Sequence, residues 1–184
     1  MIFKKIVSLF LIIVFSFSVN GHEKKWPEKR LRKAWPMAQS FTSKQVSLTS
    51  SQISQLTTDG IKIGPEDRSP TFYFAQEKVA STEKLKSVGI ILFIDEYGAN
   101  GRIEISVAMG SDGKVKKVDL WEHSENSLIS KDDFLNQFIG KTSKDAIVED
   151  KDFQPVKEAY KASKAVALAV QKALKITNII YGKN

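Results

Sequence analysis

The chain has 184 residues, of which 42% are apolar and 27% are charged, and its formal net charge is +7. This length and apolar share suit a single globular domain with an ordinary core. The absence of cysteine excludes disulfides, thiolate metal sites and cysteine-ligated iron–sulfur clusters.

Residues 1–21 are predicted to be a secretory signal peptide. Two lysines precede an uncharged, largely apolar run over residues 6–19, and the small residue Gly21 follows. This pattern is typical of a signal that is cleaved, here after Gly21. The run is shorter than the roughly 20 residues that a membrane-spanning helix needs, although an uncleaved anchor is the alternative. We therefore expect an exported, periplasmic or extracytoplasmic protein with a single domain over residues 22–184.

A basic segment is expected to open the mature chain. Residues 22–33 (HEKKWPEKRLRK) hold six Lys or Arg and two Glu. Such a segment can rest on an anionic membrane surface or on an acidic partner; the alternative is a solvated first helix. Nucleic acid is not an expected partner, because the protein is exported and its charges are mixed elsewhere.

A helix, a strand and a second helix are predicted in the N-terminal third. The first helix is expected to begin at Trp26 and Pro27, since proline is tolerated in the first turn, and Pro36 limits it. Residues 41–48 read as a strand, and residues 49–56 read as a short helix with a hydroxyl residue as its cap.

Four β-like segments and two helices are predicted in the rest of the chain. The segments are residues 71–80, 88–97, 101–109 and 115–121, and the turn GSDG joins the last two. A short helix is expected at residues 132–138. A long amphipathic helix is expected at residues 157–176, where apolar residues recur every three or four positions. These elements predict an α+β fold, with a twisted antiparallel sheet packed by short helices and a long C-terminal helix.

Several local strings then follow one another in a known order. A hairpin of the type GxIxxxVxxxxDGKVxxVxxxEHxE spans residues 101–125, and a string of the type FxxQFxGK spans residues 134–141. A helix and strand over residues 32–46 precede them, and an amphipathic helix follows. Over residues 26–176 the chain resembles the FMN-binding domain family, which includes the C subunit of the sodium-pumping NADH:quinone reductase and the G subunit of the Rnf complex.

The resemblance implies an exported flavoprotein fold that takes part in electron transfer in a membrane-linked redox chain. It implies an electron carrier or binding module rather than an independent enzyme. The implied partner is a membrane-associated redox or envelope protein. We predict no catalytic residue and no metal ligand.

The flavin-attachment motif of the family is degenerate in this chain. In the family, the threonine of S-G-A-T forms an ester with the FMN phosphate, at a helix start whose backbone N–H groups receive the phosphate charge. The aligned positions here hold Lys157, Glu158, Ala159 and Tyr160. The Tyr160 phenol cannot take the place of a threonine oxygen, and Glu158 repels phosphate, which Lys157 and Lys161 offset in part. Covalent attachment is therefore not expected.

FMN is instead expected to bind non-covalently, with its phosphate at the start of the last helix and its ring near Glu125. The candidate cofactor-binding residues are Glu125, Lys157, Ala159, Tyr160, Lys161 and Ser163. Glu125 belongs to a polar cluster, residues 122–125, that reads either as the edge of a ligand pocket or as a solvated strand end.

The alternative is a flavin-free domain that serves as a structural or interaction partner in an envelope complex. The missing Ser, Gly and Thr of the attachment motif favour this alternative. In that case Tyr160 is expected to plug the space that the cofactor has left, because burying such a side chain contributes about 1.5–3 kcal/mol.

Overall fold

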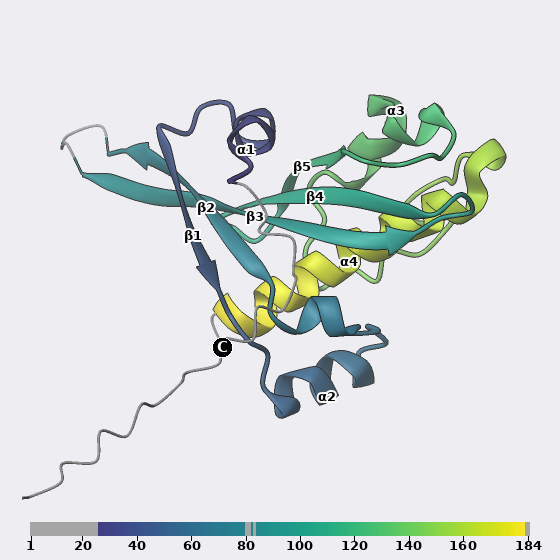
Figure 1. Cartoon of the computed structure of the whole chain (residues 1–184), viewed down its shortest axis with the longest axis horizontal. Helices are drawn as coiled ribbons and strands as arrows, with labels where there is room; N and C mark the ends of the chain where they lie inside the picture. Colours follow the sequence, from purple (N-terminus) through teal and green to yellow (C-terminus); the bar gives the residue numbers. More distant parts are fainter. Residues whose placement is uncertain (1–25, 80–81, 83, 183–184) are drawn as a thin grey trace, which may run out of the picture.

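The computed structural model describes residues 26–79, 82 and 84–182, so the predicted signal peptide and its cleavage site lie outside the described residues. The chain forms a five-stranded antiparallel sheet in which each strand pairs with the next one in sequence (Figure 1). The strands are β1 (Ser40–Gln45), β2 (Thr71–Lys78), β3 (Leu85–Tyr97), β4 (Arg102–Gly110) and β5 (Val115–Leu120). The meander with its accompanying helices confirms the predicted α+β fold.

Four α-helices and four short 3₁₀-helices accompany the sheet in the described residues. The α-helices are α1 (Glu28–Ala34), α2 (Ser50–Thr58), α3 (Asp132–Leu135) and α4 (Tyr160–Tyr181). The 3₁₀-helices are η1 (Pro65–Arg68), η2 (Ser127–Ser130), η3 (Asn136–Phe138) and η4 (Lys157–Ala159). No helix in this part of the chain is long and apolar enough to cross a membrane.

The long helix α4 lies against one face of the sheet (Figure 1). Alternate residues of β4, including Ile103, Ile105 and Val107, are fully buried in the main apolar cluster. Val166 and Val170 of α4 belong to the same cluster and are equally buried. The strand repeat of two and the helical repeat of three or four place these side chains on facing surfaces, and their burial fixes α4 on the sheet.

The short helix α1 covers part of the opposite face. It contacts β4 and β5, and its Leu31 and Ala34 join Tyr73, Ile91 and Ala108 in a second apolar cluster. A helix of seven residues is only about 10 Å long. It therefore leaves part of this face, over β1, β2 and β3, without a covering helix.

Strand β1 is shorter at its end than the predicted segment 41–48. The N–H groups of Val46 and Leu48 still donate to the carbonyls of Pro70 and Arg68. Pro70 has no N–H to return a hydrogen bond, so the regular ladder ends at Gln45.

The predicted helices are present, with different ends. The helix expected at residues 132–138 is a single α-helical turn that continues as η3. The last helix begins as η4 and runs beyond residue 176 to Tyr181. The helix continues to Tyr181 because the Tyr181 ring packs edge-on against two rings of β2. Its centroid lies 5.0 Å from that of Phe72 and 5.7 Å from that of Phe74.

A buried ion cluster ties α4 to two other elements. The ammonium of Lys172, whose side chain is 5% exposed, lies 2.9 Å from Asp67 Oδ2 of η1 and 2.5 Å from Glu96 Oε1 of β3. Burial alone lowers the pKa of Lys172, but hydrogen bonds to Glu96 and Asp67 outweigh it, and the pKa is raised. The cluster therefore holds a charged lysine inside the domain.

Candidate functional site

The buried hydroxyl of Ser163 forms two hydrogen bonds at the start of α4. Its Oγ accepts a hydrogen bond from the N–H of Val156 at 3.0 Å and donates one to the carbonyl of Ala159 at 3.1 Å. Ser163 is fully buried, and Ala159 is nearly so. These two candidate residues shape the helix start from inside, and neither presents a free hydroxyl to a ligand.

Tyr160 lies on the surface of the helix start. Its side chain is half exposed, and its hydroxyl donates to Glu149 Oε2 at 2.9 Å. Lys164 binds the same oxygen at 2.8 Å. Hydrogen bonds from Lys164 and Tyr160 lower the pKa of Glu149, and the hydrogen bond to Glu149 raises the pKa of Tyr160. The expectation that Tyr160 is a buried plug is therefore wrong, because Glu149 holds the ring outside the core.

A cleft of about 410 Å³ lies between the first half of α4 and the end of β3. Its walls include Glu96, Tyr97, Phe153, Lys161, Lys164 and Leu168. Glu96 is engaged by Lys172, and Lys164 is engaged by Glu149. This flavin-sized volume falls in the usual range for small-molecule sites. We call it the α4 cleft.

Two lysines at the start of α4 have no carboxylate partner in the described part of the chain. Lys157 lies on η4, and Lys161 lies on the first turn of α4 and lines the cleft. Both are exposed, and neither forms an ion pair or side-chain hydrogen bond among the described residues. Glu158 between them is also exposed. The helix start therefore offers two free cations and one anion.

Glu125 holds the turn between β3 and β4. Its Oε1 accepts from the N–H of Asn100 at 2.5 Å, and the Asn100 amide donates to the carbonyl of Ser124 at 3.2 Å. A Cβ on Gly98 would lie 2.3 Å from Oε1 of Glu125, so a larger residue there would displace the Glu125 carboxylate from this position. Glu125 thus fixes the turn that follows Tyr97, but it is not part of the wall of the α4 cleft.

The imidazole of His123 braces the same region. Its Nδ1 accepts from the N–H of Glu125 at 3.2 Å, and its Nε2 lies 2.8 Å from Ser130 Oγ. Both ring nitrogens are used inside the protein. The polar cluster at residues 122–125 therefore serves the turn and the chain entering η2.

The comparison with protein families agrees with this geometry. Residues 98–175 match the model of the FMN-binding domain. Over these residues the chain is similar to the FMN-binding domain family. The matched residues begin at the turn that Glu125 holds and include β4, β5 and most of α4. No curated protein matches the chain.

The residues at the start of α4 and on the cleft wall can be tested for their fit to a flavin. An ester needs a free aliphatic hydroxyl at the start of α4, and the Ser163 hydroxyl is buried with both of its hydrogen bonds made inside the helix start. A phosphate needs cations, which Lys157 and Lys161 supply. A planar ring needs flat apolar contacts, which Tyr97 and Phe153 supply on the cleft wall.

Of the cleft-wall residues named above, sequence reasoning identified Lys161 and missed the other five, which are Glu96, Tyr97, Phe153, Lys164 and Leu168. Lys164 and Leu168 lie three and seven positions after Lys161, on the same face of the helix. The prediction for Lys161 could therefore have been extended to them. Phe153 gave no signal, because it comes from the irregular chain before η4. Its place in the wall depends on a tertiary arrangement.

Proposed function

We propose that the protein binds FMN non-covalently in the α4 cleft and carries electrons in an exported, membrane-linked redox chain. The observation that supports this most is the position of Lys161, a cation without a carboxylate partner in the described residues, on the wall of a flavin-sized cleft. The match of residues 98–175 to the FMN-binding domain supports the identity of the ligand.

Each part of the cleft then has a defined role. Lys157 and Lys161 bind the phosphate at the start of α4. Tyr97 and Phe153 contact the ring and limit its access to water. Bound FMN supplies the ability to take up and release one or two electrons, and no residue of the chain needs to act as a catalytic acid or base.

The test is a titration of the mature protein with FMN and with riboflavin, followed by flavin fluorescence. Removal of both cations by Lys157→Ala and Lys161→Ala is expected to weaken FMN binding about tenfold, or about 1.4 kcal/mol, and to leave riboflavin binding unchanged. The matched control carries Lys29→Ala and Lys44→Ala, which remove two exposed lysines outside the cleft. Equal affinity of the protein for FMN and riboflavin would refute the phosphate site.

A flavin-free interaction protein is the second candidate function. The hydroxyls of Ser163 and Tyr160 both form hydrogen bonds within the protein, so neither is free for the covalent attachment that the family uses. This observation favours the flavin-free candidate. A protein that stays colourless with excess FMN, while correctly folded, would establish this candidate instead.

The basic segment at residues 22–33 bears on where the protein acts. Arg30 pairs with Glu104 and Glu122, and Arg32 pairs with Glu28. Lys33 of α1 also forms an ion pair, with Asp119. A contact with anionic lipid or an acidic partner through this segment therefore rests on Lys29 and on the residues before Trp26.

A further inference from the structure

A larger hollow lies on the sheet face opposite α4. Its volume is about 760 Å³, and its walls come from β1, β2, β3, the residue before α1 and the chain around η1. It occupies the part of the sheet that the short helix α1 leaves open. We call it the acidic groove.

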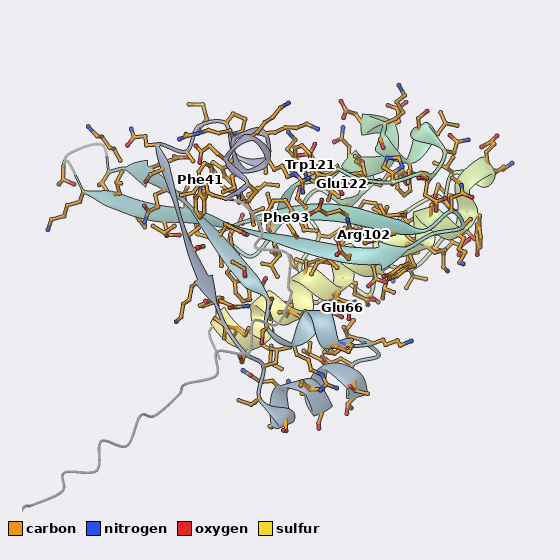
Figure 2. The ribbon with its side chains drawn as sticks, viewed as in Figure 1. Phe41, Glu66, Phe93, Arg102, Trp121 and Glu122 are labelled. Atoms are coloured by element: carbon orange, nitrogen blue, oxygen red, sulfur yellow. The ribbon has the colours of Figure 1, made fainter. Side chains whose placement is uncertain are left out.

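The floor of the acidic groove is aromatic. Trp26 packs edge-on against Tyr73 with ring centroids 5.6 Å apart, and Tyr73 packs edge-on against Phe93 at 5.5 Å. Trp26 remains 44% exposed. Figure 2 labels Phe93 on β3 and Glu66 on η1, two residues that line the groove. Tyr73 itself is buried, so the accessible apolar surface of this row comes from Trp26 and Phe93.

The charge of the groove opposes the charge of the whole chain. Glu66 and Asp95 line it, and no Lys or Arg of the described residues does, although the chain has a net charge of +7. Glu66 is exposed and forms no ion pair or side-chain hydrogen bond in this part of the protein. Asp95 binds Arg102 through Oδ2 at 2.9 Å, while its Oδ1 is buried without a hydrogen-bond partner among the described residues. The groove therefore holds negative charge that is only partly compensated.

The polar wall of the groove suits an extended peptide. Ser43 and Gln45 of β1 lie opposite Tyr73 and Thr71 of β2 in the sheet register. Their hydroxyl and amide groups line the groove and can donate to or accept from a peptide backbone.

We propose that the acidic groove binds an extended, basic segment of a partner protein. A Lys or Arg side chain of that segment lies with its apolar stem on Trp26 and Phe93 and with its charged end toward Glu66 and Asp95. Charge complementarity then selects basic over neutral segments. This binding does not require FMN.

The experiment measures the fluorescence anisotropy of a labelled Ser/Ala heptapeptide with one central arginine, added to the flavin-free mature protein. The same peptide with citrulline keeps the shape and removes the charge. The arginine peptide is expected to bind at least about tenfold more tightly, and its advantage should shrink as salt is added. Equal binding of the two peptides, or no binding of either, would overturn the proposal.

Variants of Glu66 and Asp95 test whether the peptide binds in the acidic groove. Glu66→Gln together with Asp95→Asn is expected to remove the preference for arginine. The matched control is Asp132→Asn with Asp133→Asn, which changes the same charge on α3, outside the groove. Circular dichroism checks that each variant is folded. An unchanged preference in the groove variant would place the peptide elsewhere, and a protein dimer that Glu66→Gln dissociates would assign the groove to a second copy of the chain.

Discussion

At the scale of single residues, hydrogen bonds within the protein hold the start of α4 in place. The family's ester requires a free hydroxyl, whereas the hydroxyl of Ser163 is used to join Val156 to Ala159. Tyr160 keeps its phenol on Glu149, at the surface. The local geometry is thus built on internal hydrogen bonds, and in the proposed function the FMN phosphate is held by charge.

Replacement of Ser163 should destabilise this region. Ser163→Ala leaves the partly buried N–H of Val156 without its acceptor, and the loss of such a hydrogen bond costs about 1 kcal/mol. We expect that loss in the free energy of unfolding measured by urea denaturation. Ser47→Ala, which removes an exposed hydroxyl bonded to Ser69, is the matched control and should change the stability by less than about 0.5 kcal/mol. Equal effects of the two substitutions would contradict the role given to Ser163.

At the scale of elements, the sequence indicates the main elements better than their contacts. The period of two in β4 and the spacing of apolar residues in α4 predicted both elements, because burial of one face imposes that pattern. The burial of Lys172 could not be predicted, since its partners Asp67 and Glu96 come from distant parts of the chain. The same limit applies to Phe153 in the α4 cleft, whereas Lys161 could be identified from its place at the helix start.

Removal of the Lys172 ammonium should weaken the attachment of α4 to β3 and η1. Lys172→Met leaves Asp67 and Glu96 with an uncompensated buried charge, which costs about 3–5 kcal/mol. Addition of Asp67→Asn and Glu96→Gln to the same protein should restore most of the lost free energy of unfolding. The control Lys175→Met removes a weaker, partly exposed contact of the same helix with Asp59. A single variant as stable as the parent would show that the cluster does not anchor α4.

The same cluster sets the direction of an alkaline effect. The pKa of Lys172 is raised above its usual 10.5 by Glu96 and Asp67, despite burial. A raised folded-state pKa contributes stability below the unfolded-state value and loses it as pH rises through the folded-state value. The stability of the parent should therefore fall above about pH 10.5, where the Tyr73 and Tyr181 hydroxyls, whose pKa values burial also raises, act in the same direction. The fall should be shallower in Lys172→Met, and an identical slope in the two proteins would contradict the assignment.

At the scale of the whole molecule, the sheet separates two hollows of opposite character. The α4 cleft has Lys161, which forms no ion pair among the described residues, on its wall, and the acidic groove on the other face has the partly compensated carboxylates of Glu66 and Asp95. Asp95 of β3 lines the groove, while Glu96 and Tyr97, next to it in the chain, line the cleft. A partner segment in the groove would therefore lie against the strand that also forms the α4 cleft, as the electron carrier proposed above would require.

The intact mass and visible spectrum of the mature protein, exported by a host that makes flavin transferase and then incubated with FMN, test the central claim most directly. We expect the mass of an unmodified chain that begins at His22, together with a yellow protein whose flavin is released on unfolding. A mass increased by one FMN would contradict non-covalent binding. A folded, colourless protein of unmodified mass would contradict flavin binding itself and leave the interaction protein as the function.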